Sequence, residues 1–272
     1  MSNLRKADKR LRQYFTTITM KATCIVTALL IITAITALGQ NSELKKEQIQ
    51  SIQKLVNSFK ANNKTKIVDV IDYPLRREYP LKDVKDKNDF LQRFDDIFDR
   101  QFIDRVAESK ISDWSEVGWR GIMLDNGTLW IDDNGKIMTV NYQSPKEKQL
   151  LAYAIQADKN QLPKSLQNFE KPLYLLFTKN YKIRIDEKSE GIYRYAAWKI
   201  KKQKSEPDII IENGVLEFQG SGGNHTITFK NDGYTYTVSI NELGTVDTPD
   251  ATLEVSKQEK ILLTEGGKIK RN

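Results

Sequence analysis

The stretch RGIMLDNGTLWIDDNGKIMTVNY, Arg120 to Tyr142, contains Asp-Asn-Gly twice, between short apolar runs. Asn-Gly between alternating apolar residues is a strong β-hairpin signal, because both central residues of such a turn need a positive φ. The apolar runs at 122–124, 128–131 and 136–142 therefore predict a three-stranded antiparallel meander. Helical patterns precede it, and this order predicts an α+β fold with helices packed on one face of the sheet.

Two segments before the meander have the spacing of amphipathic helices. Residues 42–61 carry apolar side chains three and four positions apart, and residues 88–107 carry a stripe of phenylalanine and isoleucine. Asn88 or Asp89 is suited to cap the second helix. The stretch 66–81 between them contains a β-branched run and two prolines, which predicts a strand or turn followed by a loop.

The sequence pattern changes after the meander. Residues 145–172 are expected to form a helical or irregular connector, and residues 173–266 alternate between apolar and polar positions. Turn signals such as Asn213-Gly214 divide this region into eight or nine short strands, which predicts a small barrel or sandwich. The basic residues 267–272 are expected to form a tail. The expected order is thus a segment 1–39, an α+β domain at 40–144, a connector, a β-rich domain and a tail.

Part of the α+β region resembles a known family. An amphipathic helix precedes a hairpin that ends in tryptophan, and the residues that carry the pattern are Phe94, Asp95, Ile97, Phe98, Gly121, Met123, Asn126, Gly127 and Trp130. This resembles NTF2-like (cystatin-like, cone-shaped α+β) domains of exported bacterial proteins, over residues ~44–144 only. Asp125 stands where the family pattern has glycine. The resemblance implies a pocket between sheet and helices; some members are isomerases or dehydratases and many only bind.

The N-terminus has the three parts of a secretory signal peptide. A basic region precedes an uncharged apolar run from Cys24 to Leu38, and small residues lead up to Gly39-Gln40. The run of 15 residues is short for a membrane span, which needs about 20. We expect cleavage near Gly39 and a secreted or periplasmic protein, with a membrane anchor at residues 22–38 as the alternative. The start of translation, at Met1 or Met20, stays open.

Composition excludes several functions. The chain has 43 basic and 36 acidic residues, and most of its net charge of +7 lies in residues 1–39, so the remainder has no basic character that would suggest nucleic-acid binding. A chain beginning at Gln40 has no cysteine and a single histidine, His225, which is expected to be a partly exposed surface residue. Nucleophilic triads and histidine metal sites therefore cannot be built. Gly220, Gly222 and Gly223 precede a strand rather than a helix, which favours a hairpin over a phosphate loop. We expect no cofactor.

The acidic turn residues Asp132, Asp133 and Asn134 are the one candidate metal site. Neither Asp-Asn-Gly copy fits the spacing of an EF-hand, so only a nonstandard calcium site remains. Hairpin turns already explain Asp and Asn at these positions.

Candidate functional residues are otherwise carboxylates and aromatics. Asp72 and Asp95 are candidates for a general base, which would need a desolvated carboxylate. Trp114, Trp119, Trp130 and Tyr73 are candidates for ligand binding, because tryptophan and tyrosine give large contact areas. The β-rich half adds further aromatics at Tyr193, Tyr195, Trp198, Tyr234 and Tyr236.

These observations favour an exported, non-catalytic binding or inhibitor-like protein. Its partner would be a protein, peptide or glycan of the envelope or the extracellular space. The alternatives are an NTF2-like isomerase or hydrolase that uses a pocket Asp, and a membrane-anchored envelope scaffold. Whether the protein is an enzyme stays open, and its residues favour a non-catalytic role.

Overall fold

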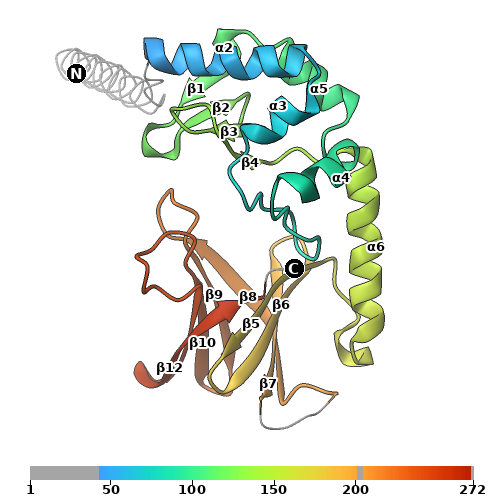
Figure 1. The fold of residues 1–272 in the computed structure, drawn as a ribbon. Helices are drawn as coiled ribbons and strands as arrows, with labels where there is room; N and C mark the ends of the chain where they lie inside the picture. The colour runs from blue at the N-terminus through green and yellow to red at the C-terminus, as the bar shows by residue number, and fades with distance from the viewer. Residues whose placement is uncertain (1–42, 201–204, 271–272) are drawn as a thin grey trace, which may run out of the picture. The chain divides into compact units, whose positions relative to one another are not determined.

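The computed structural model describes residues 43–200 and 205–270. From Leu44 onward the chain forms one compact unit. It consists of helices with a small sheet, then a long helix, then a barrel of strands (Figure 1). The predicted mixture of helices and antiparallel strands, with a barrel in the second half, is confirmed at this level.

The first predicted helix is present as α2 (Lys46–Lys60), which buries Ile52, Leu55 and Phe59 along one side. The second is broken into α4 (Lys87–Ile97) and α5 (Arg100–Ala107). Asp99 causes the break, because its side chain accepts a hydrogen bond from the Phe102 amide and so caps a new helix. Asp86 caps α4, in place of the expected Asn88 or Asp89, whose amides donate to its side chain.

The stretch after α2 differs from its prediction. Instead of a strand or turn, α3 (Lys64–Asp69) forms, and the Asn63 side chain caps it by accepting a hydrogen bond from the Lys66 amide. Ile67 and Val68 are buried by this turn of helix. Extended pairing is limited to two isolated bridges, one between Ile71 and Ile137 and one between Leu75 and Val84. A local cap thus outweighs the β propensity of the branched residues.

The predicted meander is confirmed. It comprises β2 (Ile122–Leu124), β3 (Leu129–Ile131) and β4 (Ile137–Val140), and β1 (Trp114–Glu116) adds a fourth antiparallel strand beside β2. Short 3-10 helices at 111–113 and 118–120 flank β1. The helices and this sheet share one core, in which five phenylalanine rings contact one another: Phe59, Phe90, Phe94, Phe98 and Phe102.

The connector is mostly one helix, α6 (Pro145–Gln161), followed by a 3-10 turn at Lys164–Leu166. Ser144 caps α6 by accepting a hydrogen bond from the Glu147 amide, and proline occupies the first turn. Glu147 is buried, and Arg77 meets it through two guanidinium nitrogens. This buried pair fixes the start of α6 to the loop that follows α3.

Eight antiparallel strands then close into a barrel. They are β5 (Lys171–Thr178), β6 (Tyr181–Ser189), β7 (Ile192–Lys199), β8 (Ile209–Phe218), β9 (His225–Asn231), β10 (Tyr234–Ile240), β11 (Ala251–Lys257) and β12 (Lys260–Ile269). Each strand pairs with its neighbour in sequence, and β12 pairs with β5. Closure removes the free edges that a sandwich would leave.

Two details of the barrel differ from the prediction. Asn213-Gly214 is a bulge inside one long strand, because the register against β7 shifts there by a residue and Asn213 has φ 60°. The predicted basic tail begins too early, because residues 267–269 belong to β12 and pair with residues 176–178. These three pairs close the barrel.

Candidate functional site

The barrel is filled in its middle and open toward one end. Inward side chains such as Ile183, Ile185, Ile227 and Val238 are fully buried and form its core. A cavity of about 600 Å³ lies at the end of the barrel where β5, β7, β9 and β11 end and β6, β8, β10 and β12 begin. We call this cavity the barrel mouth, lined by Tyr181, Tyr195, Ala197, Lys199, Asp208, Ile209, Tyr234, Tyr236, Leu253, Val255, Leu262 and Leu263.

Four tyrosines give the barrel mouth its character. The ring of Tyr195 lies at the base, 5.7 Å from the ring of Tyr236 and 5.5 Å from that of Phe229. Burial raises the pKa of Tyr195, and the neighbouring Tyr236 and Tyr181 raise it further. Burial also raises the pKa of Tyr236, together with Tyr234 and Asp232. Both hydroxyls therefore stay protonated at neutral pH and can donate hydrogen bonds.

The rim of the mouth is more exposed. Leu262 is 52% exposed and its neighbour Ile261 56%. The ammonium of Lys257 lies 4.4 Å from the centre of the Tyr234 ring, and the Asp208 carboxylate accepts a hydrogen bond from the Lys199 amide. Apolar surface at the base and polar groups at the rim are what a binding pocket needs to hold a ligand and orient it.

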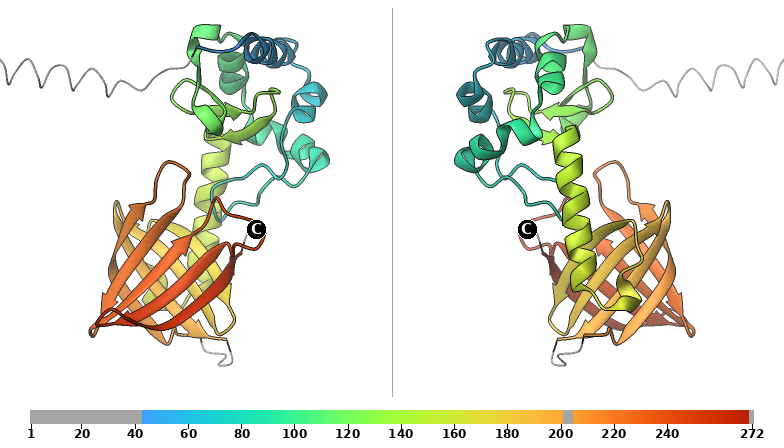
Figure 2. Two further views of the ribbon diagram at one scale, coloured as in Figure 1. Left: turned by 90° about the vertical axis from the view of Figure 1, so that its left-hand side faces the viewer. Right: turned by 90° about the vertical axis from the view of Figure 1, so that its right-hand side faces the viewer.

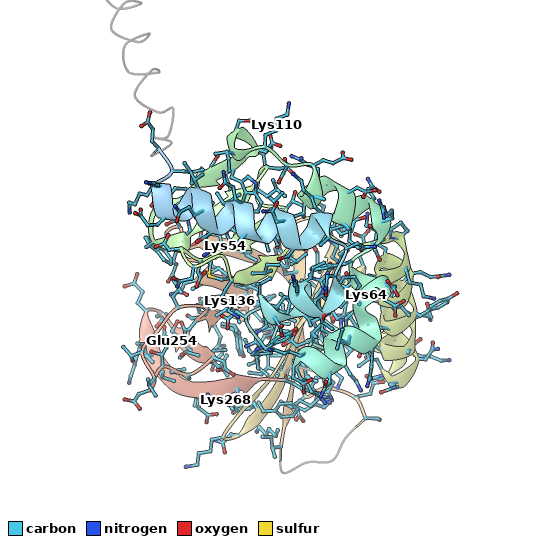
Figure 3. The ribbon with its side chains drawn as sticks, turned by 45° about the horizontal axis from the view of Figure 1, so that its top comes forward. Lys54, Lys64, Lys110, Lys136, Glu254 and Lys268 are labelled. Atoms are coloured by element: carbon cyan, nitrogen blue, oxygen red, sulfur yellow. The ribbon has the colours of Figure 1, made fainter. Side chains whose placement is uncertain are left out.

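The two candidate general bases, Asp72 and Asp95, do not line the barrel mouth. Asp72 is exposed, and the Asp95 side chain is 78% exposed and paired with Lys64 at 2.7 Å (Lys64 is labelled in Figure 3). Both side chains are exposed, whereas a general base of the expected kind would be buried away from water. The hypothesis of a desolvated Asp gains no support from either residue.

The four aromatics singled out in the α+β region do not come together. Trp114 is buried in the core, where its indole nitrogen donates to the Ser109 hydroxyl. Trp119 is 68% exposed. Trp130 is half-buried and lies 5.8 Å from the Arg120 guanidinium, while the Tyr73 hydroxyl donates to the Val68 carbonyl oxygen.

The acidic residues of the β3–β4 turn form hydrogen bonds that stabilise the fold. One Asp132 oxygen accepts hydrogen bonds from the Asn134 and Lys136 amides, which holds the β3–β4 turn. Asp133 accepts from the buried side chain of Gln48 on α2. Within residues 43–200 and 205–270, no three acidic, histidine or cysteine side chains gather as a set that could hold a metal ion.

His225 was predicted to be partly exposed, and this is wrong. It is buried at the other end of the barrel, where Nε2 lies 2.9 Å from the Tyr174 hydroxyl and Nδ1 lies 2.8 Å from the Gly223 carbonyl oxygen. The glycines before it form the β8–β9 hairpin loop, as their context predicted. Contacts on both ring nitrogens explain how a polar ring is tolerated inside.

Part of the barrel mouth was visible in the sequence. Tyr195, Tyr234 and Tyr236 were noted as aromatics of the β-rich half, but Tyr181 and the aliphatic lining were missed. Alternation places Tyr234 and Tyr236 on one face of their strand. Choosing the inward face required knowing that the strands close into a barrel.

The expected signal segment lies outside the described residues. None of the helices in the described part of the chain is long and apolar enough to cross a membrane. Comparison of the chain with protein-family models, with curated proteins and with solved structures gave no match.

Proposed function

We propose that this chain is an exported, non-catalytic binding protein whose recognition site is the barrel mouth. The observation that carries the proposal is the cavity of about 600 Å³ with four tyrosines in its lining. Small-ligand sites commonly have volumes of about 300–1,000 Å³ and combine apolar walls with few polar groups. An eight-stranded barrel is about the smallest that can enclose one such ligand.

The lining indicates the chemistry of the ligand. Tyrosine rings offer flat apolar faces, and their protonated hydroxyls donate hydrogen bonds. Leu253, Val255 and Leu263 add aliphatic surface between them. This combination suits a sugar ring or a bulky peptide side chain, in keeping with a glycan or peptide partner in the envelope or outside the cell.

A catalytic role has less support. Acid–base chemistry on such a ligand needs titratable groups matched to the reaction. Asp208 is the one carboxylate among the lining residues of the mouth, and its side chain is engaged with the Lys199 amide. Burial raises the pKa of the Tyr195 and Tyr236 hydroxyls, so these two stay protonated and serve to hold a ligand.

The family to which the first domain belongs is also a proposal. We propose that residues ~44–144 are an NTF2-like domain, supported by helices α2, α4 and α5 sharing a core with an antiparallel sheet. In this proposal the module supports the barrel and does not act as an isomerase or hydrolase. An experimental structure that shows strands curved around the helices would agree, and a flat sheet would contradict it.

The binding proposal is tested by filling the mouth. Ala197 is 3% exposed and lines the cavity, so Ala197→Phe places a ring inside it. The full chain, immobilised, is challenged with solubilised envelope glycans and peptides from the producing cells. The wild type and the control Tyr153→Ala, on the exposed side of α6, are expected to retain the same component, and Ala197→Phe to lose it. Equal retention by all three contradicts the proposal.

A further inference from the structure

Helix α6 lies against the outside of the barrel (Figure 2). Buried charges hold it there. Arg184 of β6 is 3% exposed and pairs with Asp158 of α6 and with Asp186 of its own strand. Arg194 of β7 also pairs with Asp186 and donates to the Leu166 carbonyl oxygen. Two guanidinium groups and two carboxylates thus compensate one another.

A second cavity lies beside this cluster. Its volume is about 400 Å³, and its walls are α6 and the outward-facing residues of β5, β6 and β7. Helix α6 contributes Ala154 and Ala157, whose small side chains leave space open. The barrel contributes Lys182 and Trp198, which are directly paired across β6 and β7.

The lining of this cavity carries more positive charge than negative. Lys182, Arg184 and Lys270 line it, against Asp158 alone, and Asp158 already pairs with Arg184. In the part of the chain that the structure describes, no carboxylate lies within ion-pair distance of Lys182 or Lys270. Burial lowers the pKa of Lys182, and the charges of Arg184 and Lys270 lower it further. Repulsion among these cations would be relieved by an anion.

Two aromatic side chains complete the walls. The ammonium of Lys182 lies 4.7 Å from the centre of the Trp198 ring, which holds it at the cavity surface. Tyr79 lines the cavity from the other side, and burial together with the nearby Asp158 raises the pKa of its hydroxyl. A protonated hydroxyl is a hydrogen-bond donor for an anion.

We propose that this cavity binds an anion that bears a carboxylate or phosphate group, with Lys182 and Lys270 as its charge partners. The site is separate from the barrel mouth, because adjacent residues of β7 face opposite sides: Ala197 lines the mouth, and Trp198 lines the anion cavity. The two sites can therefore be tested independently.

The test is calorimetric titration of the full chain with inorganic phosphate and, separately, with succinate, at an ionic strength kept constant with sodium chloride. At least one of the two is expected to bind saturably, and the stronger one identifies the preferred group. Lys182→Gln is expected to weaken this binding by about tenfold or more, since a charge-assisted contact is lost.

Lys268→Gln is the matched control. It makes the same charge change on β12, two residues from Lys270, and Lys268 is exposed and pairs with Asp250 (Figure 3). This variant is expected to bind the anion as the wild type does. Ala154→Phe fills the cavity from α6 and provides a second test if Lys182→Gln unfolds. Ala197→Phe, which blocks the mouth, is expected to leave anion binding unchanged.

Two results would overturn the proposal. One is the absence of saturable binding of both anions to the wild type. The other is equal weakening by Lys182→Gln and Lys268→Gln, which would mean that only net charge matters.

Discussion

Residues on both faces of strand β6 are buried, although only one face is apolar. Strands β6 and β7 alternate apolar and polar residues, and the sequence correctly indicates that Ile183 and Ile185 share one face. It gives no sign that Arg184 and Asp186, on the opposite face, are also buried. Their burial follows from α6 and the segment after it, which cover a face that the alternation marks as exposed.

The buried charges make a prediction for stability. Asp186 is fully buried and pairs with both Arg184 and Arg194, so Asp186→Ala leaves two buried guanidinium groups without their shared partner. We expect a loss of about 3–5 kcal/mol in the free energy of unfolding. Arg100→Ala, at an exposed ion pair on α5, is the comparison and is expected to cost about 0.5 kcal/mol. Urea denaturation measures both, and similar losses would show that the cluster contributes little.

Glu265 makes a prediction for pH dependence. Burial raises its pKa, but hydrogen bonds from Thr178 and Asn180 outweigh burial, so the pKa lies below its ordinary value of 4.5. A carboxyl with a lowered folded-state pKa stabilises the protein above its unfolded pKa, and this contribution is lost as the pH falls through the folded value. Glu265→Gln should therefore be less stable than the wild type at neutral pH, and the difference should shrink in acid.

Urea midpoints measured from about pH 7 to about pH 3 test this. Glu254→Gln is the control, because Glu254 lies on the neighbouring strand β11 beside the inward-facing Leu253 and points outward (Figure 3). A difference between wild type and Glu265→Gln that stays constant down to the acid end would contradict the assignment.

At the scale of elements, the sequence predicts the type of most segments but not their breaks. The stripe of phenylalanines continues through Asp99, so periodicity alone indicates one helix where the structure has two. Conversely, Asn213-Gly214 has the composition of a turn, yet the chain continues as one strand. The neighbouring strands explain why the chain does not turn here. Strand β7 pairs with the first half of β8 and β9 pairs with the second half, so the extra residue forms a bulge.

The bulge predicts a specific cost for one added methyl group. A Cβ at Gly214 would lie 2.2 Å from the Phe229 ring inside the barrel. Gly214→Ala is therefore expected to lower the free energy of unfolding by about 1–3 kcal/mol through overpacking. Replacing Phe229 by Leu in the same chain should recover part of this loss, which a double-mutant cycle measures.

Gly191→Ala is the comparison for backbone effects alone, because Gly191 has φ +72° and open space around it. Full additivity of Gly214→Ala and Phe229→Leu would contradict the packing explanation.

At the scale of the whole molecule, alternation in the second half predicts a small barrel or sandwich, and the structure is a closed barrel. Closure depends on pairing between residues 176–178 and 267–269, which are far apart in sequence. Two consecutive glycines in β12 weaken its strand signal, and this explains why a tail was expected there. The position of the barrel mouth also depends on closure, because its lining comes from six strands and one loop. The sequence alone therefore does not locate it.

The central claim is that a ligand is held among the tyrosines of the barrel mouth. Fluorine NMR of the full chain labelled with 3-fluorotyrosine tests this directly, with signals assigned by single Tyr→Phe variants. The probe is the envelope component eluted from the immobilised wild type. The signals of Tyr195 and Tyr236 are expected to shift on titration, and that of the exposed Tyr153 to stay in place. Saturable binding without a shift of Tyr195 or Tyr236 would contradict the account.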